Sequence, residues 1–432
     1  MDWKKIYETK LTTADVAVEQ IKSEDRVAVG LGVGASPALL DALVENHKSY
    51  HDVELASMLP VIKTDYLNPE MEEHFRHNSL FVSANSRQTV SSGHGDYTPC
   101  YFYRIPLLFG NDLPVDVALI QVSPPDEHGY CSFGVSVDYT KHAADAAKIV
   151  IAQVNKYMPR TLGDSFIHVS QIDLIVEQDE PILSPAAPKI GDVEKAIGEH
   201  CASLVHDGDC LQLGIGAIPD AVLLFLKDRK DLGIHTEMFS DGVLELFKEG
   251  VINNSKKNFN PGKMVAAFLM GSQEFYDFVN DNPAVSMHPT TYTNDPFIAG
   301  QNDNLVSINS CVQIDLLGQV ASETVGMTQI SGVGGQVDFV RAAAVSKGGR
   351  SIMAMPSTAK RGEVSKIVPI LDEGSVVTTN RCDVEYIVTE HGIANLKNRT
   401  NKERARALIS IAHPKFHDEL KDAFEKRFNC EF

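Results

Sequence analysis

The sequence predicts an α/β protein made of two related domains in tandem. Residues 25–37 and 209–219 each combine a short apolar strand, a glycine-rich turn and a helix that begins near a proline. A second pair of similar segments, 172–177 and 384–389, follows in the same order. Chance similarity between strand–helix units is the alternative, but two matches that keep their order along the chain favour a repeated α/β unit.

The chain length and a proline-rich stretch indicate where the two domains meet. A chain of 432 residues is roughly two to three times as long as a typical domain. Proline recurs between residues 181 and 188, and a new helical pattern begins at Asp192. We therefore predict an N-terminal domain at residues 1–185 and a C-terminal domain at residues 186–432.

The first half alternates helical and strand patterns. A helix is predicted at about residues 13–22 and a strand at 25–30, after which Ser36 is a good N-cap for a helix that Pro37 opens. Strands are predicted again at 53–55 and, as a buried run, at 115–122.

A polar segment rich in serine and glycine, residues 83–99, interrupts this alternation and is predicted to be a loop. Long ordered loops in compact domains are often functional. A lone His94 within it is nevertheless more often a surface residue than a catalyst. In the turn after the 115–122 strand, Asp126, Glu127 and His128 are consecutive, and consecutive side chains rarely converge on one ion, so no metal site is predicted.

The second half is organised around the glycine turn of residues 211–219. An apolar strand leads into Gly214 and Gly216, and Pro219 is predicted to open the next helix, whose N-terminus is suited to an anion. The following short strand ends at Glu237. Carboxyl ends of strands in open α/β sheets border the ligand crevice, so Glu237 is a candidate functional residue.

Two chemistries fit Glu237 and the glycine turn. A dinucleotide site needs a third glycine for close helix–strand packing and an acidic residue about 20 positions on. Glu237 has about that spacing from Gly214, but Pro219 occupies the position of the third glycine, which disfavours NAD binding. The other chemistry makes Glu237 a nucleophile toward an activated acyl group, with backbone N–H groups that stabilise the oxyanion. A merely solvated glutamate remains the alternative to both.

A second glycine loop, residues 331–335, precedes another short helix pattern and allows close approach of its backbone to a ligand, although a tight turn would explain it too. A dense run of basic residues follows and could meet phosphates, with a solvated face as the alternative. The run comprises Arg341, Lys347, Arg350, Lys360, Arg361 and Lys366.

Composition limits the partners and the compartment. The net charge of −19 argues against general binding of nucleic acid or of anionic membranes. The seven cysteines are scattered without C-x-x-C spacing, which indicates reduced thiols in a cytoplasm. The chain starts without an apolar signal sequence, and no run approaches the length of a membrane span. A homo-oligomer is the usual expectation for a metabolic enzyme of this size.

Three separated motifs, residues 214–219, 237–242 and 331–339, resemble the signature segments of the acetyl-CoA hydrolase/transferase family. The resemblance extends over nearly the whole chain, including Ser123-Pro124-Pro125 and Ala412-His413-Pro414. It implies two domains of the CoA-transferase fold with the active site between them. It also implies that coenzyme A is a co-substrate.

The resemblance assigns roles to individual residues. Glu237 matches the catalytic glutamate, and Asn294 with Gly334 and Gly335 matches the groups that bind the thioester, so Glu237, Asn294 and Gly335 are the predicted catalytic residues. The predicted CoA-binding residues comprise Gln212, Gly214, Ile215, Gly216, Ala217, Ile218, Gly334 and Gly335.

The implied reaction transfers CoA from an acyl-CoA to a carboxylic acid in a ping-pong sequence through a glutamyl-CoA thioester. A site that admitted water would instead make the protein an acyl-CoA hydrolase. The third possibility is a CoA- or nucleotide-binding protein in which Glu237 does no chemistry.

The substrate prediction depends on the polar segment of the first half, which the resemblance places at the pocket wall. Its hydroxyl-rich side chains suit a small hydroxylated acid, namely Ser91, Ser92, His94, Tyr97 and Thr98. A dicarboxylate would need a second cation, and only Arg87 is present there, with a structural or surface role as its alternative. We therefore predict 4-hydroxybutyrate, butyrate and acetate rather than succinate as the exchanged acids, with 4-hydroxybutyrate preferred on family likeness.

Overall fold

A computed structural model describes residues 2–186 and 188–432 of the protein. The chain divides into two compact units. The first comprises residues up to Pro185 together with two later segments, Val265–Thr293 and Ile330–Gly334. The second comprises Ala186–Met264, Asn294–Gln329 and Gly335–Phe432. The later excursions into the first unit include α10 (Gln273–Val279) and α11 (Thr290–Thr293).

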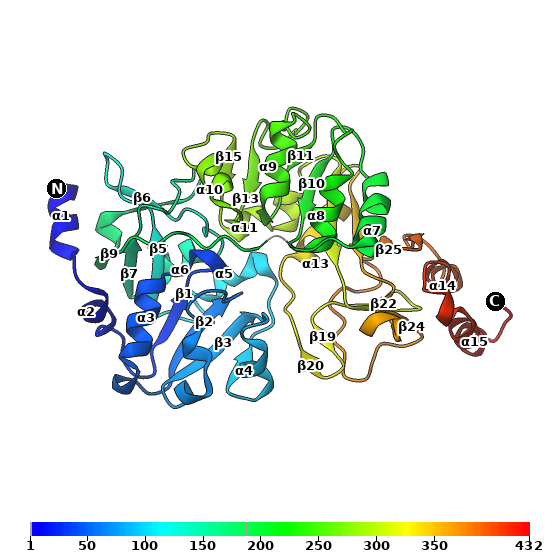
Figure 1. Ribbon diagram of the computed structural model, residues 1–432, viewed down its shortest axis with the longest axis horizontal. Helices are drawn as coiled ribbons and strands as arrows, with labels where there is room; N and C mark the ends of the chain where they lie inside the picture. The colour runs from blue at the N-terminus through cyan, green and yellow to red at the C-terminus, as the bar shows by residue number, and fades with distance from the viewer. Residues whose placement is uncertain (1, 187) are drawn as a thin grey trace. The chain divides into compact units, whose positions relative to one another are not determined.

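The first unit is built on a parallel seven-stranded sheet (Figure 1). Its strands, in spatial order, are β4 (Gly95–Tyr97), β3 (Phe75–Phe81), β2 (Val53–Met58), β1 (Arg26–Val29), β5 (Val117–Val122), β7 (Ile149–Val154) and β9 (Leu174–Glu177). A small antiparallel pair, β6 (Tyr130–Ser132) and β8 (Phe166–His168), accompanies it.

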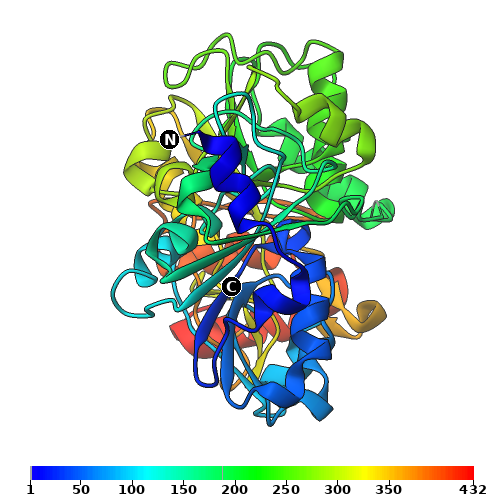
Figure 2. The same cartoon turned by 90° about the vertical axis from the view of Figure 1, so that its left-hand side faces the viewer.

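Helices cover this sheet because their apolar faces complete its core. Leu39 and Leu43 of α3 (Pro37–Glu45) are fully buried in one cluster with Val27, Leu55 and Val117 of the strands. Helices α1 (Trp3–Lys10) and α2 (Ala14–Val18) pack beside the edge strand β9 (Figure 2). The remaining helices of this unit are α4 (Arg87–Ser91), α5 (Ile105–Leu108) and α6 (Thr140–Ala146).

The second unit has a six-stranded sheet in which only the last strand is antiparallel. Its order is β11 (Gly233–Ile234), β10 (Cys210–Leu213), β16 (Leu305–Ser310), β21 (Arg350–Ala354), β25 (Tyr386–Thr389) and β26 (Gly392–Asn395). A separate three-stranded sheet contains β18 (Val320–Ala321), β17 (Gln313–Asp315) and β24 (Ile367–Val368).

Seven helices of the second unit have described bounds: α7 (Asp192–Ser203), α8 (Ala217–Leu224), α9 (Asp241–Lys248), α12 (Pro296–Ala299), α13 (Gln336–Val345), α14 (Asn401–Ser410) and α15 (His417–Phe428). Helix α13 packs on β16 and β21 (Figure 1). Its Phe339 and Ala342 are fully buried with Ala299 of α12 and with Cys210 and Leu305 of the strands.

The two sheets confirm the predicted repeat. Strands β2-β1-β5-β7-β9 of the first unit and β11-β10-β16-β21-β25 of the second have the same order and are all parallel. In these two series β1 corresponds to β10 and β9 to β25, which are the strands of the matched sequence segments. The division into continuous domains at residue 185 stays a prediction.

Three local expectations differ from the structure. Ser36 is at the N-cap of α3, but its side chain makes no capping bond, and Gln153 Oε1 accepts the Ala38 N–H instead (3.0 Å). Helix α8 begins at Ala217 rather than at Pro219. Proline fits there because its position, the third in the helix, has no intrahelical N–H bond to lose. The predicted loop at residues 83–99 contains α4 and β4.

Candidate active site

Glu237 lies between two short strands of the second unit, β11 and β12 (Met238–Phe239). The preceding Thr236 is buried, and its hydroxyl bonds the backbone of Leu213 twice, to the N–H at 3.2 Å and to the carbonyl at 3.0 Å. Leu213 is the last residue of β10, directly before the glycine turn. These bonds fix the chain before Glu237 to the strand that leads into Gly214.

The three predicted catalytic residues meet in the second unit. Asn294, fully buried, donates from Nδ2 to Glu237 Oε2 at 3.0 Å. Gly335, the N-cap of α13, lies against the same carboxylate, since a Cβ at this position would be 1.9 Å from Glu237 Oε2 and 2.6 Å from Asn294 Nδ2. Only glycine leaves this space, and the N-terminus of a helix favours a negative charge beside it.

Asp338 is a further member of this cluster that the sequence analysis missed. Its carboxylate Oδ2 is 3.4 Å from Asn294 Nδ2, and the residue is 1% exposed. An aspartate in the first turn of a helix is ordinary because it complements the helix dipole. The available signal was its place three residues after Gly335, on the same helix.

The glycine turn that was predicted to bind CoA is open. Gly216 has φ +115°, which requires glycine, and a Cβ there would meet nothing within 4 Å. At Gly214 a Cβ would touch only Pro219, at 3.8 Å. Ile215 is 48% exposed, whereas Ile218 is buried. The turn therefore presents backbone, and one apolar side chain, at the N-terminus of α8.

Gln212 is placed differently from the exposed turn. It is buried, its Oε1 accepts from Ser307 Oγ (2.8 Å) and from Asn309 Nδ2 (3.1 Å), and its Nε2 is 3.3 Å from Asn309 Oδ1. Gln212 thus joins β10 to β16 beneath the glycine turn.

The polar side chains predicted at the pocket wall belong to the first unit. Arg87 donates to the Ile330 carbonyl (2.8 and 3.2 Å), His94 Nε2 is 3.2 Å from Glu72 Oε2, and Tyr97 Oη accepts the Val333 N–H at 3.1 Å. The others bond within the same unit: Ser91 to the Gln88 carbonyl, Ser92 to the Thr89 carbonyl and Thr98 to Asn78 Oδ1. A cavity of about 210 Å³ is lined in part by Ser92 and His94.

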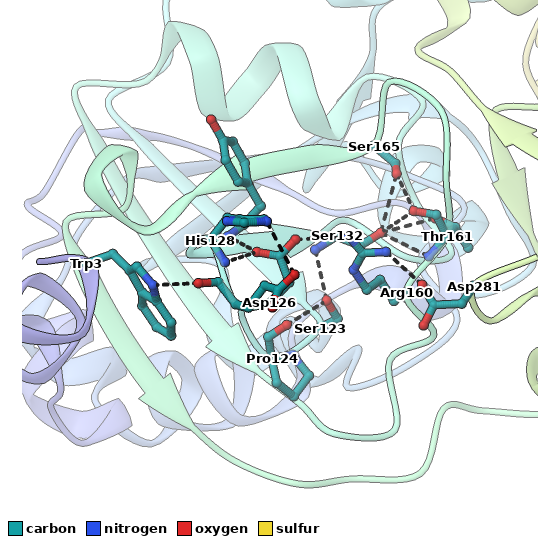
Figure 3. A network of polar contacts seen from close by, with 12 residues as sticks. Trp3, Ser123, Pro124, Asp126, His128, Ser132, Arg160, Thr161, Ser165 and Asp281 are labelled. Atoms are coloured by element: carbon teal, nitrogen blue, oxygen red, sulfur yellow. Dashed lines mark hydrogen bonds and ion pairs between the residues drawn. The ribbon is translucent and has the colours of Figure 1, made fainter.

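Asp126, in the turn after β5, takes part in a structural network of the first unit (Figure 3). It accepts the N–H groups of His128 and Tyr130 and an Arg160 bond at 3.0 Å, and Arg160 also bonds Asp281. Burial would raise the pKa of Asp126, but these bonds hold it below its usual value. Within the described residues, no cluster of three or more His, Cys, Asp or Glu could hold a metal ion.

The basic run after Gly335 does not form one free patch. Arg341 Nε is 3.5 Å from Asp383, and Arg350 is ion-paired with the buried Asp209. Lys366 donates to a backbone carbonyl, and burial lowers its pKa. The exposed members of the run are Lys347, Lys360 and Arg361.

Comparison with known proteins covers nearly the whole chain. Residues 1–185 match the acetyl-CoA hydrolase/transferase N-terminal domain and residues 271–424 the C-terminal domain. A 4-hydroxybutyrate coenzyme A transferase of Clostridium kluyveri is 60% identical over 99% of this chain and 100% of the relative. A succinyl-CoA:cyclohexane-1-carboxylate CoA transferase of Geobacter metallireducens is 44% identical over 98% and 96%, respectively.

A solved structure agrees with these matches. The crystal structure of a 4-hydroxybutyrate CoA-transferase from Porphyromonas gingivalis superposes with a TM-score of 0.86 at 44% identity, covering 99% of this chain and 100% of the other. Both domain models and these full-length similarities show that the chain belongs to the acetyl-CoA hydrolase/transferase family.

Proposed function

We propose that this CoA-transferase exchanges CoA between acetyl-CoA and short monocarboxylic acids, with Glu237 as the nucleophile. The observation that carries the proposal is the cluster in which Asn294 and Gly335 both lie against the Glu237 carboxylate. An amide donor on one carboxylate oxygen fixes how the whole group is oriented toward an incoming acyl carbon.

The reaction begins when a Glu237 oxygen attacks the acyl carbonyl carbon and the C–S bond breaks, which gives a mixed anhydride and CoA thiolate. The thiolate then attacks the glutamyl carbonyl carbon, the acid leaves as its carboxylate, and a glutamyl-CoA thioester remains. A second carboxylate reverses both steps and carries the CoA away. The thioester energy is kept throughout, because each step exchanges one activated acyl group for another.

Each tetrahedral intermediate carries an oxyanion at the former Glu237 or acyl oxygen. The Asn294 amide already donates to this carboxylate, and Gly335 opens helix α13 beside it. Preorganised donors of this kind stabilise developing charge without reorganising during the reaction. The positions of both residues therefore favour acyl transfer at this site over binding without chemistry.

CoA is proposed to bind along the glycine turn, where Gly214, Ile215 and Gly216 link β10 to α8 and Ala217 and Ile218 begin that helix. Gly334 and Gly335 would contact the thioester, and Gln212 would support the turn from beneath through Ser307 and Asn309. The acid partner is proposed to be 4-hydroxybutyrate, butyrate or acetate. The relative that is 60% identical is named for 4-hydroxybutyrate, which supports that choice.

We further propose a cytoplasmic homo-oligomer. The seven cysteines are scattered along the chain without C-x-x-C spacing, which suits a reducing compartment. Among the described residues, no helix is both long and apolar enough to cross a bilayer. Closed oligomers are the common state of metabolic enzymes of this size.

Initial-rate kinetics test the proposal. Initial rates are measured against the acetyl-CoA concentration at several fixed concentrations of butyrate. Parallel double-reciprocal lines are expected because the first acid leaves before the second enters. Intersecting lines would require a ternary complex and would contradict the sequence of steps. CoA release at the same rate with and without acid would identify a hydrolase, and no turnover at all would leave only a binding protein.

The same assay decides the substrate class. We compare kcat/KM for 4-hydroxybutyrate, butyrate, labelled acetate and succinate with acetyl-CoA as the donor. Succinate is the critical competitor because a relative at 44% identity is named for succinyl-CoA. A pocket that bonds a hydroxyl group discriminates strongly against acids that lack it. A preference for succinate would overturn the monocarboxylate proposal but not the transferase mechanism.

A further inference from the structure

We infer that Asp338 is a positioning residue for the proposed reaction: it fixes the Asn294 amide so that its NH₂ group, and not its oxygen, faces Glu237. The inference rests on the proposed function of Glu237. Asp338 does not touch the reacting atoms in this account, and it acts only through Asn294.

The geometry is a shared donor between two carboxylates. Asn294 Nδ2 is 3.0 Å from Glu237 Oε2 and 3.4 Å from Asp338 Oδ2. An NH₂ group has two hydrogens, and an ionised carboxylate can only accept, so one hydrogen is available for each. The reversed amide would place its oxygen against two acceptor groups, and the pair of carboxylates therefore selects one orientation.

The three groups are held by packed elements. Asp338 is 1% exposed in the first turn of α13, whose neighbouring Phe339 is fully buried. Asn294 is fully buried and directly precedes Asp295, the residue that caps α12, and α12 packs against α13. One helix thus supplies two restraints on the site, the space at Gly335 and the acceptor at Asp338.

This second acceptor matters because the first one changes during the reaction. Glu237 is proposed to pass from a carboxylate to a neutral acyl group, through intermediates whose oxyanion needs the amide hydrogen. While Glu237 is neutral, its hold on the amide is weaker, since bonds to charged acceptors are the stronger ones. Asp338 stays an acceptor in every state and keeps the NH₂ group in place for the next step.

The test measures the first half-reaction in the full-length protein, as the single-turnover rate of CoA-adduct formation on Glu237 from acetyl-CoA. Asp338→Asn removes the charge at constant shape and allows the amide to reverse. We expect the rate to fall about 10- to 100-fold, a size typical of a misplaced catalytic group, with unchanged affinity for CoA. Asp338→Ser is the second variant, in case the first does not fold.

A double-mutant cycle with Asn294→Ala separates positioning from a merely structural role. If Asp338 acts through Asn294, replacing Asp338 in the Asn294→Ala background should change the rate less than about twofold. The same fold-loss in both backgrounds would overturn the inference, and so would a wild-type rate in a folded Asp338 variant. Absence of any adduct in the wild-type protein would instead contradict the proposed function.

Asp315→Asn is the matched control. Asp315 is another aspartate of the second unit that is 1% exposed, and it accepts bonds from Leu317 and Gln319 rather than from the Glu237 cluster. Its replacement should lower stability and leave the rate of adduct formation per folded molecule unchanged. An equal loss of rate in this control would show that any buried aspartate matters, and would overturn the specific role of Asp338.

Discussion

Glu237 and Gly335 are in such close contact that a Cβ at position 335 would lie 1.9 Å from the carboxylate Oε2. The backbone of Gly335, with φ −90° and ψ 2°, lies in the bridge region at negative φ, a conformation that alanine can also adopt. The glycine is therefore required by its neighbour and not by its own backbone. A substitution at position 335 should therefore disturb the Glu237 carboxylate without disturbing the fold.

Gly335→Ala should consequently give a folded protein with a displaced carboxylate. We expect kcat to fall about 100-fold, the size associated with a displacement of about 1 Å at a reacting group. Steady-state transfer rates and circular dichroism would be measured together. Gly110→Ala, whose Cβ meets nothing within 4 Å, should match the wild type in both. A Gly335→Ala variant with normal kcat would show that the carboxylate position does not matter.

Gly214→Ala tests the glycine turn without backbone strain. The alanine Cβ would touch only Pro219 at 3.8 Å, and φ is not positive, so the free protein should keep its fold and stability. If CoA lies along this turn, the added methyl group meets the ligand, and the CoA dissociation constant should rise about tenfold or more, which corresponds to at least about 1.4 kcal/mol. Calorimetry that shows unchanged affinity would leave the turn as a structural feature only.

Gly216→Ala differs from Gly214→Ala because Gly216 has φ +115°, which strains an alanine whatever the space around it. A stability loss of about 1–3 kcal/mol is expected, together with weaker CoA binding. Gly250→Ala is the control, since it combines φ +78° with open space at the end of α9. It should lose stability and keep its affinity for CoA. Loss of CoA affinity in both variants would point to general destabilisation.

The buried Asp138 should make the first unit less stable as the pH rises. Burial raises its pKa to about 6 despite bonds from Ser136, Tyr139 and Thr140. Because the folded pKa lies above the unfolded value, the stabilisation is complete below about pH 4 and is lost as pH passes through about 6. The change is on the order of 2–3 kcal/mol, at 1.36 kcal/mol per pKa unit.

Urea unfolding from pH 4.5 to 7.5 checks this dependence. Trp3 is the single tryptophan and bonds the Glu127 carbonyl, so its fluorescence reports on the first unit. Asp138→Asn cannot ionise and should show a smaller fall in stability over that range, with the two proteins most alike near pH 4.5. Equal pH slopes for the two proteins would mean that Asp138 is already ionised in the folded state.

The sequence predicted the architecture because the relevant signals are local. The strand, the glycine turn and the following helix are each read from a few neighbouring residues, and their repetition at 25–37 and 209–219 indicated the related sheets. Local patterns predicted the ends of helices and strands less well. Pro219 suggested a helix start, but proline is tolerated anywhere among the first residues of a helix. Residues 83–99 were predicted to be a loop because they are polar and rich in serine and glycine. This composition does not exclude a short helix and an edge strand, and the segment contains both.

Local sequence patterns could not predict the contacts of the candidate site. Family likeness selected Glu237, Asn294 and Gly335, yet nothing in their spacing shows that one amide bonds one carboxylate. Asp338 was missed because the same residue type in the first turn of a helix has a common role with the helix dipole. Likewise, no linear signal shows that residues 265–293 join the first unit. Tertiary packing decides each of these features.

The covalent intermediate is the most direct test of the account. The protein is incubated with acetyl-CoA and no acceptor, digested under mild conditions and analysed by mass spectrometry, with Glu237→Gln as the control. We predict a CoA adduct on the peptide that contains Glu237, absent from the control and discharged by added butyrate. Turnover without any adduct on that peptide, or an adduct on another residue, would contradict the central claim that Glu237 carries the CoA.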